Sequence, residues 1–224
     1  VSIMAIGAAF SALEVVPLTL LTLDAWDFIK LQKEPCADCG KPLALKQKWA
    51  VMFLIAVGFW NFLGAGVFGF LINLPIVSYF EMGTTLTPNH GHAAMFGVFG
   101  MLALAVLVYC LRALASDGAW GRAEKFIRAG FWGLNAGLGL MIVLNLFPAG
   151  VLQLYDVVLN GYAHARSVEF TMTGLFHTTE WVRLAGDMTL LFAGAVPFAI
   201  GATLAVFGIL RERPEDARQT VHTH

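Results

Sequence analysis

Two histidines separated by a single residue, His90 and His92, are the part of this sequence best suited to binding metal. They stand at the start of a long apolar run that favours a membrane helix. Successive helical residues are rotated by about 100°, so side chains two residues apart point to nearly opposite sides. The two imidazoles therefore cannot easily chelate one metal. Each can bind a different one, as the axial ligands of two separate haems do.

Glu14 is a second residue whose type and place suggest chemistry. Its carboxyl group has apolar neighbours on both sides, and ionisable groups inside a membrane span are costly and typically functional. Pro17, three residues later, is expected to kink the helix or to free a carbonyl near this carboxyl group. We interpret Glu14 as a residue that carries protons or contributes to a metal site. The alternative is a carboxyl group that is satisfied by a neighbouring helix and serves packing alone.

Asp187 is expected just inside the start of the last apolar run. It could cap a helix N-terminus, where the helix dipole favours an acid, and a functional role is the equal alternative. Four asparagines in apolar runs are expected to form hydrogen bonds between helices: Asn61, Asn73, Asn135 and Asn145.

The elements that must position these groups are membrane helices. The 224 residues are 58% hydrophobic and 13% charged, and their mean hydropathy is +0.72, which is not the composition of a soluble domain. Apolar runs of about 20 residues, enough to cross a bilayer, occur at residues 1–23, 49–77, 90–114, 129–154 and 184–210. They predict an all-α membrane protein with about five transmembrane helices, forming a single transmembrane domain over residues 1–224.

The chain begins within an apolar run and lacks the charged start and cleavage pattern of a signal peptide. We therefore expect it to be the C-terminal part of a larger membrane protein, the alternative being a complete small five-helix protein. Its net charge of −1 gives no indication of a nucleic-acid partner.

Basic residues predict the orientation in the membrane. Twelve of the 14 Lys and Arg residues fall in the first loop, the third loop or the tail, and only Arg166 and Arg183 fall in the fourth loop. The positive-inside rule then places the C-terminus in the cytoplasm and both histidines toward the outer side. Residues 155–183 are expected to form an aromatic outer loop with a short helix on the membrane surface.

Two further patterns carry less weight. Cys36 and Cys39 form a CxxC pair, which is half a zinc site, a redox pair or a coincidence of a loop, and no second pair completes four ligands. Residues 64–69 match GxGxxG, but inside an apolar span rather than after a strand, so they do not indicate nucleotide binding. Ala65 and Gly69 instead predict close helix packing, and the glycines of residues 130–139 predict either close packing or space for a flat macrocycle.

The residues around these motifs resemble the large subunit of bacterial nitric oxide reductases, most of all the single-chain, quinol-dependent form. The resemblance covers essentially the whole chain, and is carried by FWNFLGAGVFGF at 59–70, NHGHAA at 89–94, FSALE at 10–14, GVLQ at 150–153 and ARS at 165–167. The HxH motif alone would also fit the wider haem–copper oxidase superfamily. The flanking residues make the likeness specific.

The resemblance implies a helical bundle of which this chain is the last five spans. By motif position, His90 would be the proximal ligand of the high-spin haem b3, and His92 an axial ligand of the low-spin haem b. Glu14 matches the glutamate beside the family's non-haem iron, which acts around that iron and in proton supply. The family reaction joins two nitric oxide molecules into N2O and water with two electrons and two protons, and quinol supplies the electrons.

The departures from the family limit what this chain could do alone. The family's non-haem iron is held by histidines on earlier spans, and the second ligand of the low-spin haem also lies there. The family's N-terminal extracytoplasmic domain is absent as well. We therefore expect the isolated chain to be inactive and to depend on the N-terminal part of the same enzyme.

Quinol access is expected near the outer membrane surface, where Glu180, Trp181 and Asp187 cluster in sequence. An aromatic ring with two carboxylates could stack on a quinol and form hydrogen bonds to it, or the three could be interface anchors and a helix cap. Two other functions stay open. One is a relative that dismutates nitric oxide to N2 and O2. Changed iron and quinol ligands on the earlier spans would distinguish such an enzyme from a reductase. The other is an electron-transfer cytochrome b or an inactive fragment. Reduced-minus-oxidised spectra with and without nitric oxide would distinguish these from an enzyme.

Overall fold

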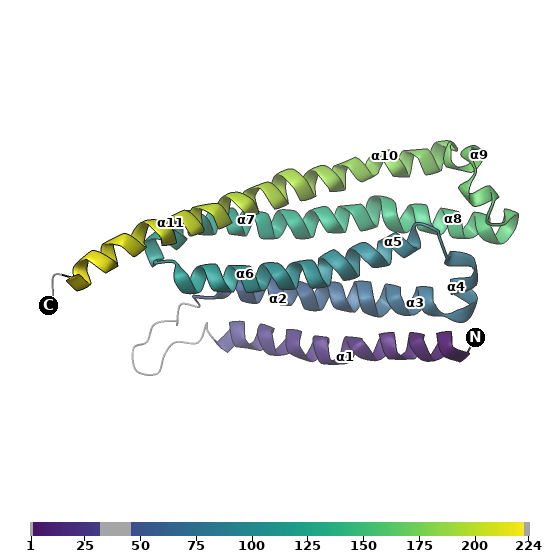
Figure 1. The fold of residues 1–224 in the computed structure, drawn as a ribbon. Helices are drawn as coiled ribbons and strands as arrows, with labels where there is room; N and C mark the ends of the chain where they lie inside the picture. The colour runs from purple at the N-terminus through teal and green to yellow at the C-terminus, as the bar shows by residue number, and fades with distance from the viewer. Residues whose placement is uncertain (1, 32–45, 222–224) are drawn as a thin grey trace.

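The computed structural model describes residues 2–31 and 46–221, and within them the chain is built from helices without a strand. Five helical segments are long and apolar enough to cross a membrane, which confirms the five predicted spans. They lie side by side and run alternately in opposite directions (Figure 1).

Most spans consist of several helical elements in succession. The first is α1 (Ser2–Leu31), the second combines α2 (Lys48–Trp60), η1 (Asn61–Phe68) and α3 (Gly69–Asn73), and the third combines α5 (Leu86–Gly91), η2 (His92–Gly100) and α6 (Met101–Leu114). The fourth combines α7 (Asp117–Met141), η3 (Ile142–Leu146) and α8 (Phe147–Asn160), and the fifth α10 (Gly174–Met188), η5 (Thr189–Ala195) and α11 (Val196–Val221). The elements η1, η2, η3 and η5 are π-helical. Such wider turns occur frequently at functional sites.

Local chemistry explains several of the helix ends. Leu74 has an extended backbone because it precedes Pro75, which disfavours helical geometry in the residue before it, and the short α4 (Pro75–Glu81) begins there. Ser116 caps α7 by accepting a hydrogen bond from the Ala119 N–H at 3.2 Å. Gly161 ends α8 with a φ of 86°, a conformation that favours glycine.

The predicted boundaries of the last two spans are wrong. The fourth span begins at Asp117 instead of residue 129, and the fifth begins at Gly174 instead of residue 184. The apolar run indicates only which part of a helix lies in lipid. Helical backbone hydrogen bonding continues beyond that part, so both helices are longer than their apolar runs. The predicted outer loop therefore shrinks to residues 161–173, which contain η4 (His164–Arg166) and α9 (Val168–Thr171).

The alternation of the spans brings most of the described basic residues to one end of the bundle. This end holds the end of α1, the beginnings of α2 and α7, and the end of α6 (Figure 1). It therefore includes Lys30, Lys48, Arg112 and Arg122. The opposite end carries α4, α5, α9 and the start of α10, and so both histidines of the HxH motif (Figure 1).

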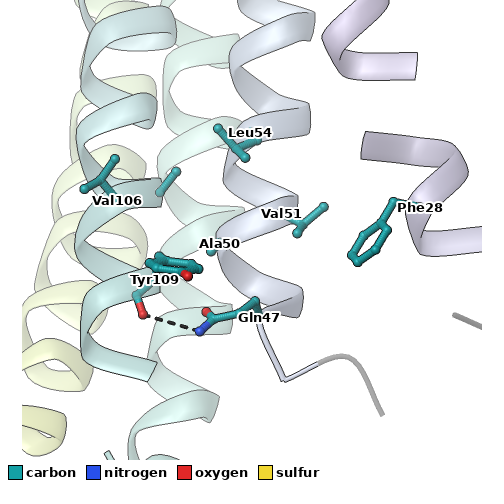
Figure 2. Close-up of a pocket in the computed structure, with 8 residues that line it drawn as sticks. Phe28, Gln47, Ala50, Val51, Leu54, Val106 and Tyr109 are labelled. Carbon is teal, nitrogen blue, oxygen red and sulfur yellow. Dashed lines mark hydrogen bonds between the residues drawn. The ribbon is translucent and has the colours of Figure 1, made fainter. Parts of the chain in front are cut away.

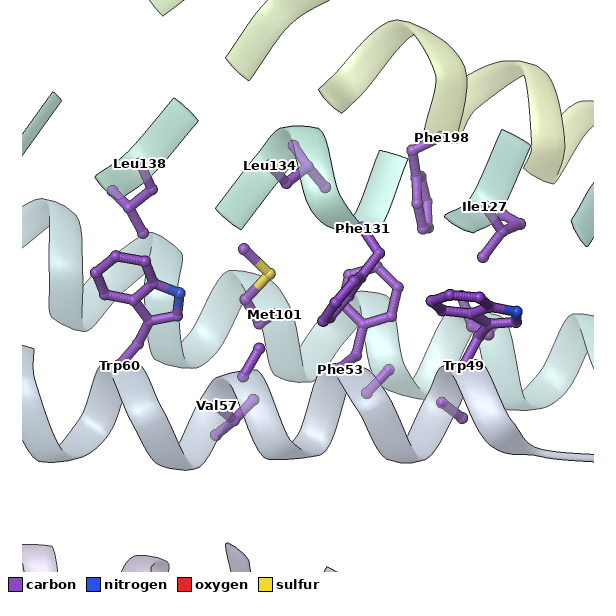
Figure 3. Packing of buried hydrophobic residues seen from close by; sticks show 14 of the residues in the cluster. Trp49, Phe53, Val57, Trp60, Met101, Ile127, Phe131, Leu134, Leu138 and Phe198 are labelled. Atoms are coloured by element: carbon purple, nitrogen blue, oxygen red, sulfur yellow. The ribbon is translucent and has the colours of Figure 1, made fainter. Parts of the chain in front are cut away.

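The core lies between α2, α6, α7 and α11. Phe53 is fully buried and meets Phe131 and Phe198 edge-on, with ring centroids 5.0 and 5.7 Å apart. Trp49, Phe53 and Trp60 rise from one side of α2 toward α7 (Figure 3). Both of these tryptophans donate a hydrogen bond to α7. Trp49 Nε1 donates to Glu124 Oε1 at 2.9 Å, and Trp60 Nε1 donates to Asn135 Oδ1 at 2.8 Å.

Glycines on α7 allow the last span to approach closely, which confirms the packing prediction at Gly130, Gly133 and Gly137 but not at Gly139, where an added Cβ would meet nothing within 4 Å. A methyl group added at Gly130 would lie 2.7 Å from Phe198 Cβ, and one added at Gly137 would lie 2.5 Å from Leu190 Cα. At Gly133 it would overlap the carbonyl of Ala193. With little hydrophobic drive between helices in lipid, such close backbone contact is a main source of association.

We expect Gly133→Leu to destabilise the protein because the larger side chain cannot fit against the backbone of η5. Overpacking of this kind costs about 1–3 kcal/mol. The measurement is the thermal unfolding midpoint of the protein purified in detergent. Gly121→Leu, on the same helix with nothing within 4 Å of an added Cβ, is the matched control. An equal midpoint for the two variants would contradict the packing argument.

Candidate functional site

His90 lies in α5 and rests against the second span. Its Nδ1 is 2.8 Å from the carbonyl oxygen of Gly64 in η1. A methyl group added at Gly69 would lie 3.0 Å from His90 Cε1, so the absence of a side chain there makes room for the ring. Two glycines of the neighbouring span therefore determine where this imidazole sits.

His92 faces a different part of the bundle. Its Nδ1 is 2.8 Å from the carbonyl oxygen of Pro88, one turn earlier on the same helix. The ring lines a cavity of about 320 Å³ together with Phe96, Leu138, Met141, Asp187 and Leu190. These residues come from η2, α7, α10 and η5. His90 thus binds the second span while His92 faces a cavity lined by the fourth and fifth spans, in agreement with the divergence predicted from their spacing.

In both rings Nε2 is the nitrogen that can bind a metal. When Nδ1 carries the proton and donates it to a carbonyl, the lone pair of Nε2 is available to a metal. Metal-binding histidines commonly use one ring nitrogen in this way, which fixes the tautomer and the orientation of the ring. The donor set therefore fits two haem irons, one bound on each side of the helix.

The GxGxxG segment serves packing, although differently from the predicted pair of Ala65 and Gly69. A methyl group at Gly64 would lie 2.5 Å from the Ala93 side chain, and one at Gly66 would overlap Val15 of α1. Gly69 faces His90 instead. Three glycines therefore face three different neighbours. Of these three glycines, the predicted small-residue pair included only Gly69. The side chain of Ala65 lies outside the described residues.

Glu14 lies within α1, and its side chain is outside the described residues. The next residue, Val15, packs at Gly66, so this part of α1 lies against the π-helical segment that anchors His90. The helix continues across Pro17 without a break.

Asp187 does not cap a helix, so that alternative is wrong. The helix begins at Gly174, and Asp187 lies near the other end of α10. Its Oδ2 accepts a hydrogen bond from Arg183 Nε at 3.3 Å, and the residue lines the same cavity as His92. The prediction failed because the charged first part of α10 was taken for a loop.

The other two residues proposed to contact quinol point elsewhere. Glu180 Oε1 accepts a hydrogen bond from Asn145 Nδ2 at 3.0 Å. Trp181 is 65% exposed, and its Nε1 donates to His177 Nε2 at 3.2 Å. The structure therefore brings Asp187 to His92 and leaves Trp181 on an outer face.

The four asparagines divide into three groups. Asn135 and Asn145 bond to side chains of neighbouring helices, as predicted. Asn73 instead donates to the carbonyl of Gly69 in its own helix at 2.6 Å. Asn61 is 1% exposed, and its side-chain atoms have no hydrogen-bond partner among the described residues.

Sequence reasoning missed a buried acid at the end of the bundle that carries the histidines. Glu81 is only 4% exposed, and its Oε1 accepts a hydrogen bond from Thr87 Oγ1 at 2.6 Å. Burial raises the pKa of Glu81, although the Thr87 bond and the nearby His90 oppose the shift. The available signal was an acid between two apolar residues, Phe80 and Met82, in a segment taken for a loop.

His164 and Asp156 form a second polar pair at this end. Their Nδ1 and Oδ2 atoms are 2.7 Å apart, and this hydrogen bond raises the pKa of His164. In the part of the chain that the structure describes, no three His, Cys, Asp or Glu side chains are grouped to hold one metal. Cys36 and Cys39 lie outside the described residues.

Two of the other hollows lie away from the histidines and are almost wholly apolar. One, of about 410 Å³, lies between α1, α2 and α6, and its polar contact is a weak hydrogen bond of 3.5 Å from Gln47 Nε2 to the Tyr109 carbonyl (Figure 2). The other, of about 550 Å³, includes Trp26, Trp60 and Asn135. Neither brings together groups that could carry out chemistry.

Comparison with known proteins supports the resemblance seen in the sequence. The family model described as cytochrome c and quinol oxidase polypeptide I matches residues 1–189, a range that includes Glu14, His90, His92 and Asp187. A nitric oxide reductase subunit from Stutzerimonas stutzeri is 31% identical over 152 residues. That alignment covers 67% of this chain but only 30% of the relative's length.

Proposed function

Because the chain belongs to the cytochrome c and quinol oxidase polypeptide I family, we propose that it is part of a nitric oxide reductase that converts nitric oxide to N2O with electrons from quinol. Family membership and the reductase relative indicate an oxidoreductase of the haem–copper oxidase type. The observation that carries the proposal is the pair of diverging imidazoles, each with Nδ1 held by a carbonyl.

We assign His90 to the iron of a high-spin haem b3 and His92 to that of a low-spin haem b. The haem irons and a non-haem iron would supply electron transfer and the binding of nitric oxide. The chain supplies two imidazoles two residues apart on one helix, so the two cofactors would be held at a short and constant separation. Each carbonyl that binds Nδ1 increases the basicity of its imidazole and fixes the plane of its ring.

Glu14 is proposed to supply protons and to act beside the non-haem iron. The ligands of that iron, and the second ligand of the low-spin haem, would come from an N-terminal part of the enzyme. Residues 1–224 would then form one transmembrane domain of a larger catalytic chain and would be inactive alone.

Quinol contact is proposed at Asp187, because its carboxylate lines the cavity that also contains His92. A carboxylate there can accept a hydrogen bond from a quinol hydroxyl near the low-spin haem ligand. Glu180 and Trp181 lie nearer the start of α10, where Trp181 is suited to anchoring the helix at the lipid boundary.

The chain is a multi-pass membrane protein by its helices and its family. We propose that it lies in the bacterial inner membrane with its basic end and its C-terminus in the cytoplasm. A fluorescent protein that matures only in the cytoplasm, fused after His224, should therefore fluoresce. A dark fusion expressed at a normal level would contradict this orientation.

Replacing the two histidines separately tests the assignment of the haems. In the full-length enzyme, His90→Ala should remove the high-spin haem signal and abolish nitric oxide turnover, leaving at least part of the low-spin signal. His92→Ala should remove the low-spin signal first. Reduced-minus-oxidised spectra with and without nitric oxide measure both. His177→Ala, on the exposed face of α10, is the control and should retain both spectra. An unchanged low-spin spectrum in His92→Ala would refute that assignment.

Glu14→Gln tests the proton role, because the amide keeps the size of the carboxyl group and removes the exchangeable acid. Turnover should fall about 10²-fold or more, as expected when a group that transfers protons is lost, while both haem spectra persist. Steady-state nitric oxide consumption and spectra of the same preparation are the measurements. Full activity would reject the role.

A further inference from the structure

The residues just before the HxH helix are bound by a side chain from another span. Gln153 of α8 accepts two hydrogen bonds at its Oε1, from the Thr85 N–H at 2.7 Å and from Thr85 Oγ1 at 2.5 Å. Gln153 itself is only 9% exposed. Because a buried amide without partners is costly, both of its ends need bonds.

The other end of the same amide binds the outer connection. Gln153 Nε2 donates to the Ala165 carbonyl at 3.4 Å, and Ala165 is 1% exposed. The next residue, Arg166, donates from Nη2 to the Met82 carbonyl at 2.7 Å. Gln153 thus joins the segment before α5, the helix α8 and the 161–173 connection, and we call Gln153 with its partners Thr85 and Ala165 the outer clamp.

Close packing reinforces the clamp. Gly150 lies one turn before Gln153 on α8, and a methyl group there would be 2.6 Å from the Leu86 nitrogen. Leu86, the first residue of α5, is itself buried. The start of α5 is therefore held by a hydrogen-bonded side chain and by backbone contact with the same helix.

The histidines are close to this point of attachment. His90 is five residues after Thr85, which corresponds to about 7.5 Å along a helix. Thr85 itself makes no side-chain bond that caps α5. The height and rotation of this short helix therefore depend on α8, together with the bond from Thr87 to Glu81 of α4.

We propose that Gln153 is a positioning residue for the two metal-binding imidazoles, acting through Thr85 at the start of α5. This inference rests on the proposed function. Groups that orient metal ligands typically contribute about 10–100-fold to activity or metal affinity, and small displacements of a reacting centre have large effects on rate.

The test compares three variants of the full-length enzyme. Gln153→Leu removes both acceptor interactions, Gln153→Glu keeps an acceptor oxygen for Thr85, and Gln47→Leu is a control at the opposite end of the bundle. The readouts are the iron–histidine stretching band of the reduced enzyme, nitric oxide turnover, haem content, and hydrogen exchange of the peptide that contains Thr85.

Gln153→Leu should shift the stretching band, lower turnover about tenfold at unchanged haem content, and accelerate exchange at Thr85. Gln153→Glu should restore the band and most of the turnover, and Gln47→Leu should resemble the wild type. A wild-type band in Gln153→Leu would overturn the proposal. Equal losses in Gln153→Leu and Gln47→Leu, or in Gln153→Leu and Gln153→Glu, would do the same.

Two further measurements distinguish a failure of this inference from a failure of folding or of the proposed function. If Gln153→Leu does not fold, Thr85→Ala removes one of the two donors, and it should give a smaller shift of the same band. An unshifted band there would also overturn the proposal. If the wild-type enzyme binds no haem, the proposed function fails, while exchange at Thr85 still shows whether Gln153 holds the start of α5.

Discussion

The close approach of η1 and η2 is the contact on which the candidate site depends. Gly64 has no side chain, so the backbone beside it comes against Ala93, and its carbonyl comes within 2.8 Å of His90 Nδ1. In lipid an imidazole N–H without a partner would be costly. The same glycine thus brings the helices together and satisfies the ring, which leaves Nε2 as the reactive atom.

Several polar pairs lie at the same end of the bundle as this contact. Glu81 with Thr87, Gln153 with Thr85, and His164 with Asp156 each form a pair at the end of the bundle that carries the histidines. At the opposite end the polar contacts, such as Trp49 with Glu124, join helices of the core. Polar side-chain bonds therefore occur at both ends of the bundle, and the core between them packs mainly through aromatic rings and glycines.

How far the sequence predicted these features depends on whether local chemistry controls them. The five spans were predicted because about 20 apolar residues are required by the bilayer whatever the neighbours are. The start of α10 was not, because Glu180 and Arg183 look like loop residues although backbone hydrogen bonding continues through them. Asp187 was consequently taken for a possible cap, and the cavity that it shares with His92 could not be foreseen.

The amino-acid sequence by itself determined that this is a bundle of membrane helices and that His90 and His92 diverge, because hydrophobic length and helical rotation are properties of the chain alone. Only the tertiary structure decided that the Gly64 carbonyl holds His90, that Asp187 lines the same cavity as His92, and that Gln153 binds the start of α5. These contacts join residues far apart in the sequence, and they depend on how the spans are rotated and how closely they approach. Side-chain packing between helices sets both, and no periodicity within one span encodes them.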